Sequence, residues 1–241
     1  MPLEKTIDLV FRFKSFDIQQ EKSAMKVGTD GVLLGAWANP STLPQHILDI
    51  GTGTGLIAIM LAQRFQEAKI TGIDVDSDAV EEATLNMQSS PWGKRLECLK
   101  TSLQNADFND VFDLIVCNPP YFENTTKSTN DKRTKARHTD TLSLIEIFEK
   151  MPKLLSEKGE LMIIYPSESL SNIQLNLKTF GLYLNEICWV RGNENSNIKR
   201  ALLRISKEEK ELKENFLTIE KERHKYSDEY QKMCKDFYLN L

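Results

Sequence analysis

The stretch LDIGTGTGLIAIMLA (residues 48–62) joins a short apolar run, a turn with three glycines and a longer apolar run. The first run predicts a buried strand, and the second predicts a helix over 55–65. Gly51, Gly53 and Gly55 allow a tight turn between them, in which the backbone can approach a ligand closely. Free amide groups at the start of the helix would face that ligand. The stretch therefore predicts a nucleotide-binding strand, turn and helix.

The same order of strand and helix recurs along the chain. The apolar periodicity predicts strands at 47–50, 69–74, 96–100, 112–117 and 160–165, and helices at 77–88 and 141–156. This alternation favours an α/β fold, a mostly parallel sheet with helices on both faces. The strands predicted at 186–190 and 200–206 are joined by a loop too short for a crossover helix, so we expect that C-terminal pair to be antiparallel.

Composition predicts one soluble globular domain of 241 residues, 40% of them hydrophobic and 27% charged. We expect an N-terminal extension with a short strand (1–46), a core (47–206), and a charged connector with a C-terminal appendage (207–241). The longest apolar run is far shorter than the roughly 20 residues that span a bilayer. The start of the chain lacks a signal-peptide profile, so we expect a cytoplasmic protein that makes no membrane contact.

Cysteine and histidine usage argues against a metal site. The four cysteines lie far apart, without a CxxC motif or a mixed His/Cys cluster. We therefore expect no metal and no disulfide framework, which suits a reducing compartment.

Charge is distributed unevenly along the chain, whose net charge is −4. Residues 124–138 hold five basic residues and one acidic residue, a net charge of +4, so the rest of the chain sums to −8. A concentrated basic segment on an acidic body indicates local anion binding, although a charged surface loop without a partner has the same composition.

Two acidic residues accompany the glycine turn. Asp74 ends the predicted strand 69–74, where its carboxylate can accept hydrogen bonds from both hydroxyls of a ribose. Gly53, Gly55 and Ala58 also satisfy the G-x-G-x-x-A pattern of dinucleotide-binding enzymes, and a glycine turn can serve packing alone. Asp49 would repel a pyrophosphate, however, and suits a ligand with positive charge, such as S-adenosylmethionine.

The sequence CNPPYF (117–122) follows the apolar run FDLIV (112–116). Two prolines make a stiff, non-helical exit from the strand. A strand stop alone would not need Asn118 or Tyr121. The side-chain oxygen of Asn118 and the carbonyl of Pro119 can accept hydrogen bonds from both hydrogens of a planar amine, which concentrates electron density on its nitrogen. Tyr121 can stack on a flipped or unpaired base.

Together, D-x-G-x-G-x-G, the acid at the end of the second core strand and N-P-P-Y resemble the class I methyltransferases that modify planar nitrogens. AMKVGTDGVLLGAWA (24–38) and the C-terminal LTIE…YSDEYQKMCKDFYL are similar to the bacterial tRNA (adenine-N6)-methyltransferases that act beside the anticodon of a valine tRNA. This resemblance extends over nearly the whole chain. It implies a Rossmann-like fold with a seven-stranded sheet, S-adenosylmethionine as cofactor, tRNA as partner and a monomer.

The resemblance also implies the roles of individual residues. The implied catalytic residues are Asn118, Pro119, Pro120 and Tyr121. The implied donor-binding residues are Lys26, Gly28, Thr29, Asp30, Asp49, Gly51, Gly53, Gly55, Asp74, Val75, Ser102, Leu103 and Asn118. The basic side chains predicted to contact RNA phosphates are Lys127, Lys132, Arg133, Lys135 and Arg137.

Three other functions remain open from the residues. N-P-P-Y also suits a side-chain amide, as in protein-glutamine methyltransferases, although residues 1–46 are too few for the helical substrate domain of such enzymes. Methylation of a guanine in ribosomal RNA is chemically closer to adenine methylation in tRNA, the function that the resemblance implies, and it stays open. A non-catalytic nucleotide-binding or RNA-binding module would keep the glycine turn but would not need Asn118.

Overall fold

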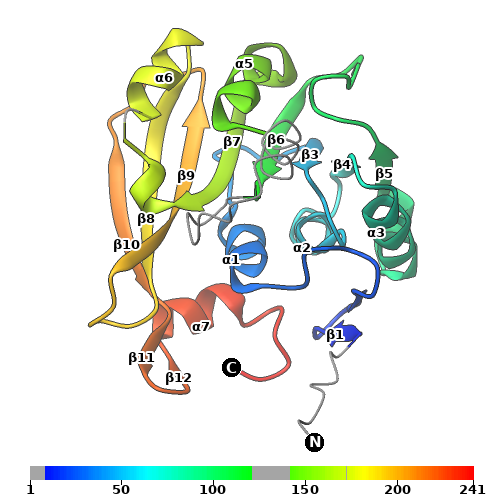
Figure 1. Ribbon diagram of the computed structural model, residues 1–241, viewed down its shortest axis with the longest axis vertical. Coiled ribbons are helices and arrows are strands. Elements are labelled where there is room, and N and C mark those ends of the chain that lie inside the picture. Colours follow the sequence, from blue (N-terminus) through cyan, green and yellow to red (C-terminus); the bar gives the residue numbers. More distant parts are fainter. Residues whose placement is uncertain (1–8, 121–141, 172) are drawn as a thin grey trace, which may run out of the picture.

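The computed structural model describes residues 9–120, 142–171 and 173–241, and one large sheet lies at its centre. The strands of this sheet are β3 (His46–Ile50), β4 (Lys69–Asp74), β5 (Leu96–Lys100), β6 (Phe112–Cys117), β7 (Leu155–Pro166), β8 (Tyr183–Arg191), β9 (Ile198–Ser206) and β10 (Lys213–Thr218). They follow the order β10-β8-β9-β7-β6-β3-β4-β5, from left to right in Figure 1. The chain crosses over the sheet between most neighbouring strands, as the alternating pattern predicts.

Strand directions confirm the expected mixed topology. The pairs β4–β5, β3–β4, β3–β6 and β6–β7 are parallel, whereas β9 runs antiparallel to both β7 and β8. The predicted count of seven strands is wrong by one, because β10 pairs in parallel with β8 at the edge of the sheet. Residues 213–218, which lie within the expected charged connector and C-terminal appendage (207–241), therefore form a strand.

Helices cover both faces of the sheet, as predicted. The helices are α1 (Thr29–Trp37), α2 (Leu56–Arg64), α3 (Ser77–Ser89), α5 (Leu144–Leu154), α6 (Ile173–Thr179) and α7 (Asp228–Cys234), with the 3₁₀ turns η1 (Gly93–Arg95) and η2 (Ser167–Ser169). Helices α1, α2, α3 and α7 share one apolar cluster, and α5 and α6 share the other. In Figure 1, α5 and α6 lie at the top, and α7 lies below α1.

The central strand β6 shows how the sheet separates the two clusters. Leu114 and Val116 pack into the first cluster, whereas Ile115 and Cys117 pack into the second. All four are almost completely buried. Side chains alternate between the faces of a strand, so an uninterrupted apolar run is what a strand covered on both faces requires. Burial of each of the Leu, Ile and Val side chains stabilises the fold by about 1.5–3 kcal/mol.

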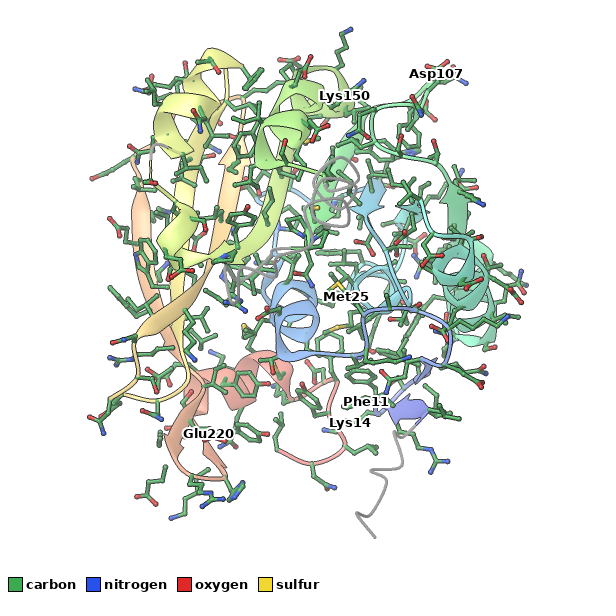
Figure 2. The ribbon with its side chains drawn as sticks, in the orientation of Figure 1. Phe11, Lys14, Met25, Asp107, Lys150 and Glu220 are labelled. Carbon is green, nitrogen blue, oxygen red and sulfur yellow. The ribbon has the colours of Figure 1, made fainter. Side chains whose placement is uncertain are left out.

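The two ends of the described chain pack against each other. The short strands β1 (Val10–Arg12) and β2 (Asp17–Gln19) form a hairpin, and β11 (Glu220–Glu222) and β12 (Lys225–Tyr226) form a second one. The amide of Lys14 donates to the carbonyl of Phe237 at 2.8 Å, and its ammonium donates to the carbonyl of Lys235 at 2.6 Å. Figure 2 labels Phe11 and Lys14 at this lower side of the molecule. The C-terminal segment thereby fastens the N-terminal hairpin to the core.

Candidate functional site

The glycine turn between β3 and α2 is open on its outer side. Gly51, Gly53 and Gly55 have φ angles of 69°, 54° and 81°, in the left-handed region that favours glycine. A Cβ atom added at Gly51 or Gly53 would meet nothing within 4 Å. The amides of Gly51 and Thr52 donate to the carbonyl of Ile73, at 2.9 and 3.0 Å, which ties the turn to the end of β4. A ligand can therefore approach the backbone of a turn that is itself held firmly.

Asp49 lies beneath the turn rather than on its surface. Its side chain is fully buried, and its Oδ2 accepts hydrogen bonds from the Thr52 hydroxyl at 2.7 Å and the Ala58 amide at 3.2 Å. Burial raises the pKa of this carboxyl group to about 7, and the nearby charge of Asp74 adds to the effect, while both hydrogen bonds oppose it. Asp49 therefore joins β3, the turn and α2. Its predicted attraction for a cationic ligand stays a prediction.

Asp74 connects the end of β4 to the turn. Its Oδ2 accepts from the Gly53 amide at 2.9 Å, and its Oδ1 accepts from the Asp76 amide at 3.0 Å. Asp76 in turn caps α3 by accepting from the Asp78 amide at 2.9 Å. A carboxylate has about four acceptor positions, so Asp74 can still accept hydrogen bonds from a ligand. Beside it, Val75 is 62% exposed.

The segment that precedes and begins α1 forms the opposite wall. Gly28 is the N-cap of α1 and supplies no side-chain hydrogen bond, so the first amides of the helix face the site without a side-chain partner. The Lys26 ammonium donates to the carbonyls of Gln20 and Glu21. Asp30 forms an ion pair with Arg200 of β9, with 2.9 Å between Asp30 Oδ2 and Arg200 Nε. No sequence motif points to Arg200, because the ion pair joins residues 170 positions apart.

The end of β6 places an unpaired acceptor in the same region. The side-chain oxygen Oδ1 of Asn118 is buried and has no hydrogen-bond donor among the described residues. Pro119 is buried and Pro120 is exposed. Leaving a buried acceptor unpaired costs about 1–3 kcal/mol. An atom kept in that state at a strand end is suited to a donor that arrives with a ligand.

The loop after β5 supplies the last part of the site. Leu103 is buried, and the amide of Asn105 donates to the Ser102 hydroxyl at 3.3 Å. The loop is joined to α5 because the Gln104 amide group donates to Glu146 at 2.9 Å. Glu146 also completes a capping box with Ser143 at the start of α5, and these hydrogen bonds hold the pKa of its carboxyl group below the ordinary value.

These elements enclose one cleft of about 1200 Å³ at the carboxyl ends of β3, β4, β5 and β6. Among the predicted site residues, those lining it are Lys26, Gly28, Thr29, Asp30, Gly51, Gly53, Asp74, Val75, Ser102, Leu103, Asn118, Pro119 and Pro120. Asp49 and Gly55 are not part of the lining. Tyr121 and the five basic residues Lys127, Lys132, Arg133, Lys135 and Arg137 lie outside the described residues.

Over residues 9–120, 142–171 and 173–241, no three His, Cys, Asp or Glu side chains gather closely enough to hold a metal ion. Within the same ranges, no helix has the length and apolar character needed to cross a bilayer.

Solved structures with a similar fold are methyltransferases. A predicted O-methyltransferase of Agrobacterium tumefaciens superposes with a TM-score of 0.61 at 17% identity, covering 86% of this chain and 96% of that one. A ribosomal protein L11 methylase of Lactobacillus delbrueckii superposes with a TM-score of 0.54 at 19% identity, covering 74% of this chain and 78% of that one. At such identities the similarity shows the Rossmann-like methyltransferase fold alone.

Sequence comparison shows the family. Residues 27–182 match the family model of the methyltransferase small domain. A tRNA1(Val) (adenine(37)-N6)-methyltransferase of Flavobacterium psychrophilum is 43% identical over 96% of this chain and 100% of its own length. Proteins of the same name from Flavobacterium johnsoniae and Trichodesmium erythraeum are 44% and 43% identical, over 96% and 95% of this chain and 100% and 97% of their own lengths. The cleft, the methyltransferase fold and this nearly full-length identity lead to one conclusion: the chain belongs to the family of tRNA1(Val) (adenine(37)-N6)-methyltransferases.

Proposed function

We propose that this chain transfers a methyl group from S-adenosylmethionine to the exocyclic N6 of adenine 37, beside the anticodon of tRNA1(Val). The names of relatives that match it over nearly their whole length support this substrate. The arrangement of Asn118 at the end of β6 supports the chemistry. S-adenosylmethionine supplies the methyl group as an electrophile, and the chain supplies the positions of both partners.

The cleft suits the nucleoside of this donor. The open backbone at Gly51 and Gly53 allows close approach, and Asp74 keeps acceptor positions for the ribose hydroxyls. Val75 and Leu103 offer apolar contact on the two sides of the adenine position. The amides at the start of α1 and the residues before it would hold the amino-acid end of the donor. Asn118 lines the same cleft.

The acceptor amine needs help because its lone pair is delocalised into the adenine ring. In our proposal, Asn118 Oδ1 and the Pro119 carbonyl accept hydrogen bonds from the two N6 hydrogens, which draws the nitrogen toward tetrahedral geometry and directs its lone pair at the methyl group. The two prolines fix the direction of that carbonyl. The observation that carries this mechanism is the buried Asn118 oxygen without a donor in the described chain.

Two further parts of the proposal rest on residues outside the described ranges. Tyr121 would stack on the flipped adenine. The basic segment 124–138 would neutralise phosphates of the anticodon stem-loop, and its position directly after N-P-P-Y-F places it next to the acceptor site in sequence. We also propose that the enzyme acts as a monomer in the cytoplasm, as expected from the sequence.

The test uses labelled S-adenosylmethionine and four substrates: total tRNA, tRNA1(Val) whose adenine 37 is replaced by guanine, ribosomal RNA and a release-factor peptide. The proposal predicts label in total tRNA, recovered as N6-methyladenosine, and none in the substituted tRNA. Label in the peptide alone would identify a glutamine methyltransferase, and label in ribosomal RNA alone would identify a ribosomal RNA enzyme. Donor binding without transfer to any substrate would support a binding module.

A further inference from the structure

One wall of the cleft has no regular secondary structure. Residues 21–27 connect β2 to α1, and four of them line the cleft, from Ser23 to Lys26. Within the part of the chain that the structure describes, no backbone-to-backbone hydrogen bond involves residues 21–27. Met25 on this wall is 52% exposed and is labelled beside the start of α1 in Figure 2. The wall therefore depends on side chains to hold its backbone in place.

Glu82 of α3 provides the main attachment. It is only 3% exposed, and its two oxygens accept from two successive backbone amides, Lys22 at 2.8 Å and Ser23 at 2.9 Å. Burial raises the pKa of this carboxyl group, but the hydrogen bonds from the wall outweigh it, so the pKa lies below the ordinary value. Glu82 is therefore charged at neutral pH, and the wall's own amides stabilise that charge.

Asn86, one helical turn further along α3, holds the hairpin and the glycine turn together. It is 1% exposed, and its Oδ1 accepts from the Gln19 amide at 2.9 Å. Its Nδ2 donates to the carbonyls of Gln19 at 2.8 Å and Thr54 at 2.9 Å. Since Thr54 belongs to the glycine turn, a single face of α3 fastens both walls of the cleft.

The neighbouring Glu81 makes a different contact with the same wall. Its carboxylate pairs with the Lys22 ammonium at 2.5 Å, and the two side chains are 58% and 43% exposed. Exposed ion pairs contribute little, and salt screens them. Glu81 and Glu82 thus lie side by side on one helix and contact one residue, but of the two, Glu82 accepts from backbone amides of the wall and Glu81 does not.

We propose that Glu82 and Asn86 are positioning residues for the methyl-donor cleft, an inference that rests on the proposed function. Neither residue lines the cleft. They act by keeping residues 22–26 and the glycine turn in their binding arrangement before the donor arrives. When a binding arrangement is populated only part of the time, the apparent affinity falls by that fraction. Loss of either attachment therefore weakens donor binding specifically.

The experiment compares Glu82→Gln with the matched control Glu81→Gln, which removes the same charge one position away. Calorimetry with S-adenosylmethionine measures Kd, and steady-state kinetics with tRNA measures kcat and both KM values. We expect Glu82→Gln to raise Kd and the donor KM about tenfold or more, because a wall that loses hydrogen bonds to a charged group occupies its binding arrangement for a smaller fraction of the time. We expect kcat at saturating donor and the KM for tRNA to be unchanged, and Glu81→Gln to match the parent protein throughout.

A second pair of variants keeps the test decisive if Glu82→Gln does not fold. Glu82→Asp keeps the charge but shortens the side chain, and Asn86→Asp keeps the acceptor for Gln19 but cannot donate either of the two hydrogen bonds. Each is expected to raise the donor Kd. An unchanged donor Kd in every variant that folds, whatever its melting temperature, would overturn the inference and leave the proposed function intact. Absence of S-adenosylmethionine binding by the parent protein would overturn the proposed function itself.

Discussion

The carboxylate of Asp74 accepts a hydrogen bond from the backbone amide of Gly53 at 2.9 Å, so the residue predicted to bind the donor ribose also holds the glycine turn. The second oxygen of Asp74 holds the Asp76 amide at the start of α3. The side chain of Asp74 thus connects the end of β4 to the glycine turn and to the start of α3. Changing it would disturb ligand contact and turn geometry together.

We predict that Asp74→Ala weakens S-adenosylmethionine binding by about 10- to 100-fold, because hydrogen bonds to a charged acceptor contribute about 1.5–3 kcal/mol. Calorimetry measures the change in Kd. Asp107→Ala is the control, since Asp107 is an exposed acid that does not line the cleft. Equal donor affinity in the two variants would contradict the role assigned to Asp74.

Asp49 should make the stability of the protein depend on pH. Its native pKa of about 7 lies above the ordinary 3.8, so the native state holds the proton more tightly than the unfolded chain. The free energy of unfolding therefore falls as pH rises from about 4 to 7, by about 4 kcal/mol in total. Asp49→Asn lacks this titration. Its free energy of unfolding should therefore rise relative to that of the parent protein as pH increases over that range. Urea denaturation at pH 4, 6 and 8 measures the difference, and parallel pH profiles would show that Asp49 does not titrate there.

Arg95 should stabilise the fold without affecting the reaction. Its guanidinium donates to the carbonyls of Ala62 at 2.9 Å, Phe65 at 3.0 Å and Ala68, around the end of α2. Arg95→Ala should lower the free energy of unfolding by about 2–3 kcal/mol, since three acceptors lose their charged partner. Urea denaturation measures this. Lys94→Ala changes a neighbouring side chain that makes none of these hydrogen bonds, and it should have almost no effect. A comparable loss in both variants would contradict the capping role.

The basic segment should determine the salt dependence of tRNA binding. Replacing Lys132, Arg133, Lys135 and Arg137 by alanine should weaken binding and reduce the slope of log K against log salt by about 0.7–0.9 for each phosphate that is no longer neutralised. The control replaces four exposed lysines of the C-terminal segment, Lys210, Lys213, Lys221 and Lys225. If the slope stays the same in the first variant, or falls equally in both, the segment has no particular role in RNA binding.

The sequence predicts the inner strands of the central sheet well because these strands are buried on both faces. β4, β5 and β6 have the predicted bounds. An acidic segment that caps α3 follows β4, a polar segment follows β5, and Asn118 with two prolines follows β6. The sequence does not indicate β10 as a strand, because β10 lies at the sheet edge and only Leu217 in it is buried. The seven-residue α6 was missed because only Ile173 and Leu177 face the core, too few to produce a clear helical period.

The site could be predicted only in part. Motif spacing locates the site residues at strand ends. Those that the structure describes lie in one cleft or directly beneath it. Glu82 and Asn86 could not be found in this way, because a polar residue within a helix is usually solvent-exposed. Their hydrogen-bond partners in the hairpin and in the adjoining wall lie about 60 residues away in sequence. Only the folded arrangement shows that α3 holds the cleft walls.

The most direct test of the mechanism is the single-turnover rate of methyl transfer to tRNA1(Val) by Asn118→Ala at saturating S-adenosylmethionine, with the donor Kd measured in parallel. Our account predicts a rate lower by about 100- to 1000-fold, the usual effect of removing one hydrogen-bonding group that acts in the transition state. It also predicts a donor Kd close to that of the parent protein, and partial activity in Asn118→Asp, which keeps an acceptor oxygen. A parental rate in Asn118→Ala, or a loss explained entirely by weaker donor binding, would contradict the account.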